Sequence, residues 1–538
     1  MTLNKNYYLS LVLLVIPFLF LCLFGRYGLE DSDSGFISGL GWRILNGEVP
    51  YRDFYYVRPI VSPLLSSFWM FMLPDYGQVF FTRLITYYQL MIQVVLTVFT
   101  IKKYYDFKSL NINPYVLILV SFFITSTGTL YFQWHTTDGI LLAVIGFFLV
   151  AYFNKRSMIA LIFAGAFFGF SALTKQNFIL IPLLALAFTF LQHGFKRSVL
   201  VLIGIISTFF VFYYYLDVNN LIQLFLIQNT GSTTLKDLFI SGFASYLLGN
   251  NHFLAQSLLT VSIFIIIDKI HLLKNNKSGA LFLAFLVSIA VTNSLGFIFN
   301  RGLLIAFDKI FSIAVVASFL YLFIVRKETI SQHYLLIALL GVSWASSISW
   351  GAMSPLMFFT PLVFSTYYLL QKYFCIFDKR VSVLTVVLIA TYSCLFNLKP
   401  YGDGFIWTIT EDASVISKKL TFIKSSPNTL EKHLELKDIF KKYNNSTILP
   451  SMPGAYYIHS QTNKLSIDWA MDAEVAFDKQ GLINDTDNCC SFYILEKKHF
   501  GHPIGEHGKF YSSVADYVLD EYKLLDSNYE YFDIYIKN

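Results

Sequence analysis

Long apolar runs separated by short polar stretches fill the first three quarters of the chain. A helix that crosses a bilayer needs about 20 apolar residues, and by that measure the pattern predicts about thirteen spans. The predicted spans are 7–25, 79–101, 114–131, 138–153, 157–173, 178–192, 198–216, 253–269, 279–299, 303–324, 333–350, 355–374 and 381–398.

The apolar segment 60–73 is too short for a confident span and is flanked or interrupted by Pro59, Pro63 and Pro74. We interpret it as a helix that lies at the membrane interface. If it spanned, every later basic cluster would change sides, whereas an interfacial segment keeps all of them cytoplasmic together with Lys5. This rule favours thirteen spans, a cytoplasmic N-terminus and an external C-terminus. The clusters are Lys102-Lys103 with Lys108, Lys155-Arg156, Lys196-Arg197, Lys269 with Lys274 and Lys277, Arg326-Lys327, and Lys372 with Lys379-Arg380.

The composition changes at residue 399, where a polar segment of roughly 140 residues begins, a normal size for a domain. It holds a Lys/Glu-rich helical pattern at 428–443 and short strand-like runs. Mixed helix and strand signals favour a layered sheet. We therefore predict an all-α polytopic membrane domain over 1–398 and a small extracytoplasmic α/β domain over 399–538. The strand-like runs are STILP, AYYIHS, KLSIDW, SFYILE and YFDIYIKN.

The first external loop, 26–78, contains the most polar stretch of the membrane part. Within it, Phe36, Leu40, Ile44 and Leu45 recur at near-helical spacing, which predicts a short amphipathic helix. Asn46-Gly47 is a typical helix stop. So many charges cannot lie in hydrocarbon, so the loop is expected at the membrane surface.

Composition agrees with the pattern: 55% of residues are hydrophobic, 14% are charged, and the mean hydropathy is +0.56. A net charge of +6 without a basic face argues against nucleic-acid binding. Cys489-Cys490 lack a partner at metal-ligand spacing, so a zinc site is not expected.

Three carboxylates, Glu30, Asp31 and Asp33, follow the first predicted span. A carboxylate at the outer surface can act as a general base toward an acceptor hydroxyl. The alternative is capping, because Ser32 or Asp33 in front of an amphipathic helix is a normal N-cap.

Solitary cations at the outer ends of predicted spans form a second candidate group. An Arg fork or a Lys charge suits a phosphate, while interfacial snorkelling or pairing with loop carboxylates is the alternative. Asp138 opens a span, where it could orient a polar residue or favour the helix dipole, and His135 is interpreted as an ordinary loop histidine. The cations are Arg58, Arg83, Lys175 and Arg301.

The order of features in this loop resembles that of the integral-membrane GT-C glycosyltransferases. One span is followed by Asp33-Ser34-Gly35, then by WRILNGEVPYRDF, Arg58-Pro59 and Arg83. The lipid A aminoarabinose transferases and the protein O-mannosyltransferases belong to this superfamily. Asp138 and Thr174-Lys175-Gln176 fall where that family has an Asp opening a span and a Lys after the next span. The family's second acidic residue is replaced by Ser34, which leaves the choice among the three carboxylates open.

The resemblance implies a polyprenyl-phosphate sugar donor and transfer with inversion to a glycan, lipid or protein acceptor at the external face of a plasma membrane, the inner membrane in bacteria. Asp33 would be the base, with Glu30 or Asp31 assisting or holding a divalent cation, whose need the sequence leaves open. Arg52, Asp53 and Asp138 would support the site. The donor phosphate would be bound by Arg58, Arg83, Lys175 and Arg301.

Two alternatives remain at this stage. An external polysaccharide polymerase would use a diphosphate-linked donor, but such enzymes usually have their large external loop late in the chain. A transporter or flippase would show internal repeats and broken helices at mid-membrane, which the sequence does not display.

Overall fold

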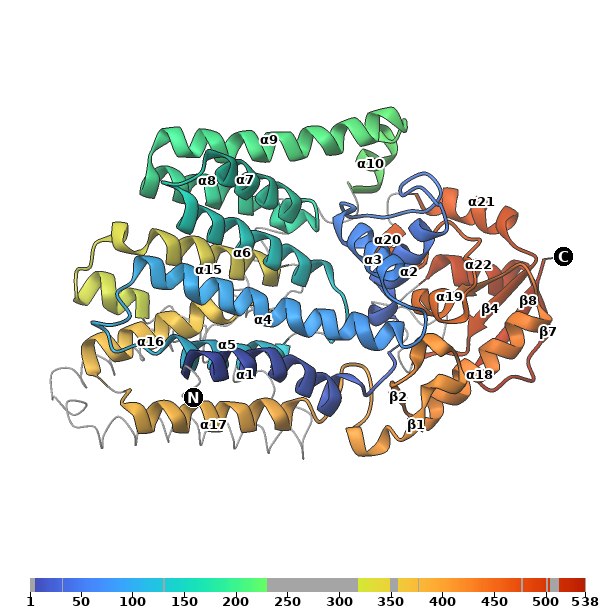
Figure 1. The fold of residues 1–538 in the computed structure, drawn as a ribbon. Coiled ribbons are helices and arrows are strands. Elements are labelled where there is room, and N and C mark those ends of the chain that lie inside the picture. The colour runs from blue at the N-terminus through green and yellow to red at the C-terminus, as the bar shows by residue number, and fades with distance from the viewer. Residues whose placement is uncertain are drawn as a thin grey trace.

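Apolar helices packed side by side make up most of the structure (Figure 1). The computed structural model describes residues 5–30, 32–128, 131–229, 318–348, 357–375, 377–475, 478–499, 502–503 and 512–537. The helices of the membrane part are α1 (Lys5–Phe20), α2 (Asp33–Leu45), α3 (Val61–Met72), α4 (Gln78–Tyr104), α5 (Pro114–Gly128), α6 (His135–Phe153), α7 (Met158–Ala172), α8 (Leu180–His193), α9 (Phe195–Val218), α10 (Ile222–Asn229), α15 (Tyr334–Ile348), α16 (Thr360–Phe374) and α17 (Lys379–Phe396), with a π-helical turn at Leu21–Gly25 and a 3-10 turn at Gln176–Ile179.

Ten of the predicted spans coincide with helices of the described ranges, within a few residues at each end. Five of these helices are long and apolar enough to cross a membrane: α4, α6, α9, α17 and the helical stretch Gln176–His193. The predicted spans 253–269 and 279–299, and most of 303–324, lie outside the described residues. The chain is thus a largely helical, multi-pass membrane protein, and the count of thirteen spans stays a prediction.

The segment predicted to lie at the interface forms α3, a helix of 12 residues. At 1.5 Å per residue it is about 18 Å long, too short to cross hydrocarbon about 30 Å thick. Its exposed apolar side chains, Leu64, Phe68, Phe71 and Met72, recur at helical spacing along one face. Such a face suits a helix that lies on the bilayer surface.

The C-terminal segment adds a mixed four-stranded sheet at one end of the bundle (Figure 1). The strand order is β3-β4-β8-β7; β3 and β4 are parallel and the other pairs antiparallel. Side chains alternate along β4, so Ile494 joins a core under α18 while Tyr493 joins one under α22. The elements are β1 (Glu411–Asp412), β2 (Lys424–Ser425), α18 (Pro427–Lys442), β3 (Ser446–Leu449), α19 (Pro453–His459), α20 (Asp472–Val475), α21 (Lys479–Cys489), β4 (Phe492–Glu496), β5 (Lys498–His499), β6 (His502–Pro503), α22 (Ser513–Glu521), β7 (Lys523–Asp526) and β8 (Phe532–Ile536).

Two of the five strand predictions in this segment are wrong. The run AYYIHS belongs to helix α19, which begins with Pro453 in its first turn and ends at Ser460 in a left-handed conformation. The run KLSIDW forms no strand and contributes only an isolated bridge between Trp469 and Ser451. Tyr and Ile favour strands, but Pro at the start of a helix and close packing on α2 outweigh that preference.

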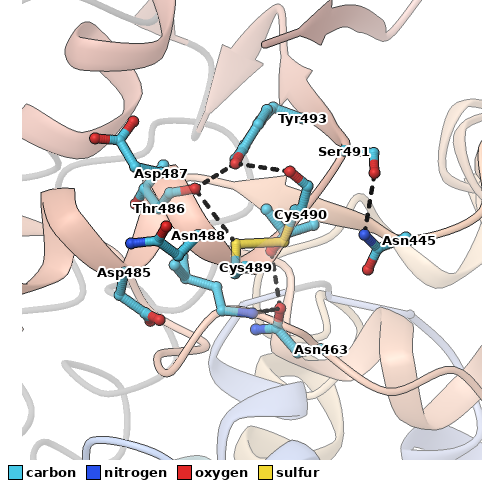
Figure 2. The surroundings of a disulfide bond; sticks show 12 residues. Asn445, Asn463, Asp485, Thr486, Asp487, Asn488, Cys489, Cys490, Ser491 and Tyr493 are labelled. Carbon is cyan, nitrogen blue, oxygen red and sulfur yellow. Dashed lines mark hydrogen bonds between the residues drawn. A yellow bond between two sulfur atoms is a disulfide. The ribbon is translucent and has the colours of Figure 1, made fainter.

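The adjacent Cys489 and Cys490 form a disulfide between the end of α21 and the start of β4. Figure 2 shows the Tyr493 hydroxyl donating to the carbonyl oxygens of Thr486 and Cys490 beside it. Disulfides persist in oxidising compartments, which suits the external side predicted for this segment.

Candidate functional site

Asp33, at the start of α2, and Lys175, after the end of α7, both lie within electrostatic range of Arg58. Helix α6 begins and α7 ends at the end of the bundle that carries the C-terminal segment, and α2 lies between the bundle and α19 (Figure 1). Every second loop between spans lies at the same end of the bundle, so polar residues distant in sequence can meet there.

Helix α2 contains the predicted amphipathic stretch Phe36–Leu45, and Glu30 caps it. Its carboxylate accepts the backbone N–H groups of Ser32 at 2.8 Å and Ser34 at 2.7 Å, which satisfies donors that the first turn leaves open. Ser32 occupies the N-cap position without a side-chain cap bond, and its hydroxyl instead contacts Ser451 and accepts from Trp469. The helix ends at Leu45, with Asn46 as its C-cap and Gly47 following at φ +90°, which agrees with the predicted stop.

Asp33 is the first residue of α2 and is half-buried. The Tyr401 hydroxyl donates to its Oδ2 atom, which fixes the orientation of the carboxylate. Burial raises the pKa of Tyr401, and the negative charge of Asp33 raises it further, so this phenol keeps its proton and stays a donor. Asp31 lies outside the described residues.

Arg58 is bound by a carboxylate of the C-terminal segment. Its Nη1 and Nη2 atoms donate to Oε2 and Oε1 of Glu474 at 3.0 and 2.8 Å, a bidentate fork. The guanidinium lies 5.1 Å from the centre of the Phe36 ring of α2, within cation–π range. Burial lowers the pKa of Arg58, but the charge and hydrogen bonds of Glu474, together with Tyr56 and Asp33, leave that pKa above its ordinary value, so Arg58 is a fixed cation.

Lys175 is buried in the turn between α7 and α8. Burial lowers the pKa of its ammonium well below the usual range, and the neighbouring charge of Arg58 lowers it further. The carboxylates of Glu474 and Asp33 act in the opposite direction. Arg58, Lys175, Glu474 and Asp33 therefore lie within electrostatic range of one another in one partly desolvated site.

Arg83, predicted to bind phosphate, instead holds the start of the loop. Its Nη1 and Nη2 atoms donate to the carbonyl oxygens of Gly25 and Gly28, both at 2.9 Å, and its guanidinium lies 4.4 Å from the Tyr131 ring centre. It also lines a cavity of about 40 Å³ between α2, α4 and α19, together with Ser38 and Tyr457. A cavity of this size holds a few water molecules at most.

The remaining predicted residues lie apart from this cluster or outside the described ranges. Asp138 is buried in α6 and accepts from the Gln89 amide of α4 at 3.1 Å. Arg52 and Asp53 pair with each other at 2.8 Å near the surface, and Asp53 also accepts the Val49 N–H. Arg301 lies outside the described residues.

Sequence reasoning missed three residues of the site. Glu474 lies 416 positions after Arg58, and no periodicity links them. His135 is not a loop residue: it opens α6, is fully buried, and lies within electrostatic range of Arg58 and Lys175. Tyr56, also buried, lies within electrostatic range of Arg58 and Glu474.

The described residues do not form a metal site: no three of their His, Cys, Asp or Glu side chains are grouped to hold an ion. Both oxygens of Glu30 accept backbone N–H groups, and Asp33 accepts from Tyr401. Both oxygens of Glu30 and one oxygen of Asp33 thus accept from protein donors, and we derive no step through a cation.

The C-terminal segment packs on α2 through backbone. A Cβ atom on Gly35 would lie 2.1 Å from the Gly454 nitrogen of α19, and one on Gly39 would lie 2.7 Å from the Pro453 oxygen. The buried Arg43 of α2 donates to Asp468 at 3.3 Å and to the Leu465 carbonyl at 2.7 Å. The C-terminal segment thus forms one wall of the site.

No protein-family model and no curated protein sequence matches the chain. Among solved structures, the chain is similar to ArnT from Cupriavidus metallidurans in the apo state, at 11% identity and a TM-score of 0.42, over 99% of this chain and 98% of that one. It is also similar to the Archaeoglobus fulgidus oligosaccharyltransferase tethered to an acceptor peptide, at 11% identity and a TM-score of 0.42, over 91% of this chain and 69% of that one.

Proposed function

We propose that this protein is an inverting glycosyltransferase that takes a sugar from a polyprenyl-phosphate donor at the external membrane face. The observation that supports the proposal most is the meeting of one carboxylate, Asp33, with two cations, Arg58 and Lys175, beside apolar helices. A carboxylate suits deprotonation of an acceptor, and the cations suit a departing phosphate.

In the proposed reaction, the Asp33 carboxylate takes the proton of the acceptor hydroxyl or amine as its oxygen or nitrogen attacks the sugar C1. The bond between C1 and the phosphate oxygen breaks, and its electron pair stays on the polyprenyl phosphate. Negative charge grows on that phosphate, where Arg58 and Lys175 stabilise it. Fixed cations are most effective where water is excluded, because the local dielectric constant is low.

Tyr401 would hold the Asp33 carboxylate toward the acceptor, and Glu30 would set the position of Asp33 by capping α2. Arg83 would fix the chain at Gly25 and Gly28, from which the loop departs. In this proposal Arg83 positions the site and does not contact the donor.

The test is incubation of the purified full-length protein in closed lipid vesicles with a panel of radiolabelled polyprenyl-phosphate sugars and with diphosphate-linked oligosaccharides. Transfer or hydrolysis of a monophosphate-linked sugar, lost in Asp33→Asn, supports the proposal. Turnover of the diphosphate-linked donors alone would favour the polymerase. Turnover of neither, with sugar or lipid moved across the membrane, would favour a transporter.

A further inference from the structure

Glu474 binds Arg58 in the geometry that a phosphate would adopt. The two guanidinium nitrogens face the two carboxylate oxygens at 3.0 and 2.8 Å, and the fork of an arginine fits two phosphate oxygens in the same way. The face of the guanidinium is covered by Phe36. A phosphate that uses this fork must therefore take the place of the carboxylate.

The charges around Arg58 favour such an exchange. The positive charge of Arg58 lies within electrostatic range of the carboxylates of Glu474 and Asp33, and Lys175 adds a second positive charge when it is protonated. Adding a phosphodiester would bring a third negative charge into a partly buried space, and like charges at close range are costly there. Moving the Glu474 side chain away as the phosphate enters restores the balance, and the long side chain allows that movement.

Some buried polar atoms near Arg58 make no hydrogen bond to the residues that the structure describes. The Tyr56 hydroxyl and both ring nitrogens of His135 have no hydrogen-bond partner among the residues that the structure describes. Leaving such a group unpaired typically costs about 1–3 kcal/mol, so a group of them calls for an explanation. Both residues lie within electrostatic range of Arg58.

Ring contacts join both residues to Phe36, whose ring lies against the Arg58 guanidinium. The ring of Phe36 lies 6.2 Å from that of Tyr56 and 6.0 Å from that of Trp134, which in turn lies 4.3 Å from the His135 ring. His135 also opens α6, and a helix N-terminus favours an anion. A hydroxyl, an imidazole N–H and a helix N-terminus are suitable donors for phosphate oxygens.

We propose that the donor phosphate binds in place of the Glu474 carboxylate on Arg58, in a subsite completed by the Tyr56 hydroxyl and the His135 imidazole. This inference rests on the proposed function for the kind of donor. Glu474 holds the arginine fork in its bidentate geometry while no donor is bound. Donor binding breaks the ion pair that joins the loop to the C-terminal segment.

The experiment measures binding of a short-chain polyprenyl phosphate to the full-length protein in detergent, with the corresponding polyprenyl alcohol as reference. Glu474→Gln keeps the side-chain shape but removes the competing charge, so the phosphate should bind roughly tenfold more tightly. Glu496→Gln is the matched control, because it also breaks an ion pair of the C-terminal segment, that with Lys432, but lies away from Arg58. It should leave the affinity unchanged.

Tyr56→Phe and His135→Leu should each weaken phosphate binding about tenfold or more, and His135→Gln, which keeps a donor, should recover part of the loss. Removing a hydroxyl without a partner does not destabilise the free protein, so Tyr56→Phe should unfold at or above the wild-type temperature. Thr100→Val is the control: its hydroxyl is equally buried and unpartnered, but near the other end of α4.

The inference is wrong if Glu474→Gln binds the phosphate no more tightly than wild type, or if Tyr56→Phe and His135→Leu bind it with wild-type affinity. A wild-type protein that binds phosphate and alcohol equally would overturn both this inference and the proposed donor. The expected binding pattern without any sugar transfer would leave the subsite standing and overturn only the proposed function.

Discussion

Asp33 accepts a hydrogen bond from the Tyr401 hydroxyl, an interaction that helix capping does not require. It is the first residue of α2, whereas the open N–H groups of that helix are satisfied by Glu30. Asp33→Asn keeps an oxygen that accepts from Tyr401 but removes the base. We expect sugar transfer to fall by about 10²–10⁴-fold, with a thermal unfolding temperature near wild type.

The matched variant is Glu30→Gln, which weakens the cap and should lower the unfolding temperature, since loss of a cap costs about 0.5–2 kcal/mol. Asp31→Asn completes the set of loop carboxylates. Full transfer by Asp33→Asn, with loss of transfer in Asp31→Asn, would move the base to position 31; full transfer by all three variants would remove the chemistry from this loop.

Lys175 gives a pH dependence of stability. Burial and then Arg58 lower the pKa of its ammonium in the folded protein, while Glu474 and Asp33 only partly oppose this. Between the lowered pKa and the ordinary lysine value, the unfolded chain binds more protons than the folded one, so the free energy of unfolding rises with pH across that window. Below the window, the buried charge remains a constant cost.

Lys175→Met should therefore raise the unfolding temperature most at neutral and lower pH, and the gain should shrink as the pH rises toward the ordinary lysine value. Thermal unfolding in detergent over a pH series checks this. Exposed Lys441 of α18 is the control, and Lys441→Met should shift the curve equally at all pH values. Parallel curves for Lys175→Met would mean that the ammonium has an ordinary pKa.

At the scale of elements, α2 is bound to the C-terminal segment by a buried ion pair. Arg43 and Asp468 are both almost fully buried, and without Arg43 the Asp468 carboxylate would lose its ion-pair partner. Arg43→Met should destabilise the protein by about 3–5 kcal/mol. Asp468→Asn should cost less, because Glu48 still pairs with Arg43 at 2.7 Å.

A double-mutant cycle of Arg43→Met and Asp468→Asn, followed by chemical unfolding, measures the coupling between the two elements. Arg52→Met is the control, since its pair with Asp53 is exposed and such pairs contribute about 0–1 kcal/mol. Additive effects in the cycle would show that Arg43 does not hold α2 to this segment.

The elements also show how far the sequence alone could lead. Apolar runs of span length predicted α4, α6 and α9 within a few residues, because hydrocarbon leaves the backbone few choices other than a helix. The sequence pattern could not predict helix α19, because the local preference for a strand is outweighed there by packing against Gly35 of α2. Likewise, Asp33, Arg58 and Lys175 were predictable from loops that share one surface, whereas Glu474 depends on how the C-terminal segment packs.

At the scale of the whole molecule, every part of the proposed function depends on the side of the membrane that the site faces. If α3 lies on the surface, the basic clusters of the membrane part stay in the cytoplasm and the C-terminal segment is external. The Cys489–Cys490 disulfide agrees with an oxidising exterior.

We expect a cysteine at position 103 to react with an impermeant maleimide only after the cells are opened, and one at position 480 to react in intact cells. Replacing the five native cysteines first removes the background. If instead position 103 reacts in intact cells and position 480 reacts only after the cells are opened, α3 crosses the membrane, Arg58 and Lys175 lie on opposite faces, and a shared phosphate site is impossible.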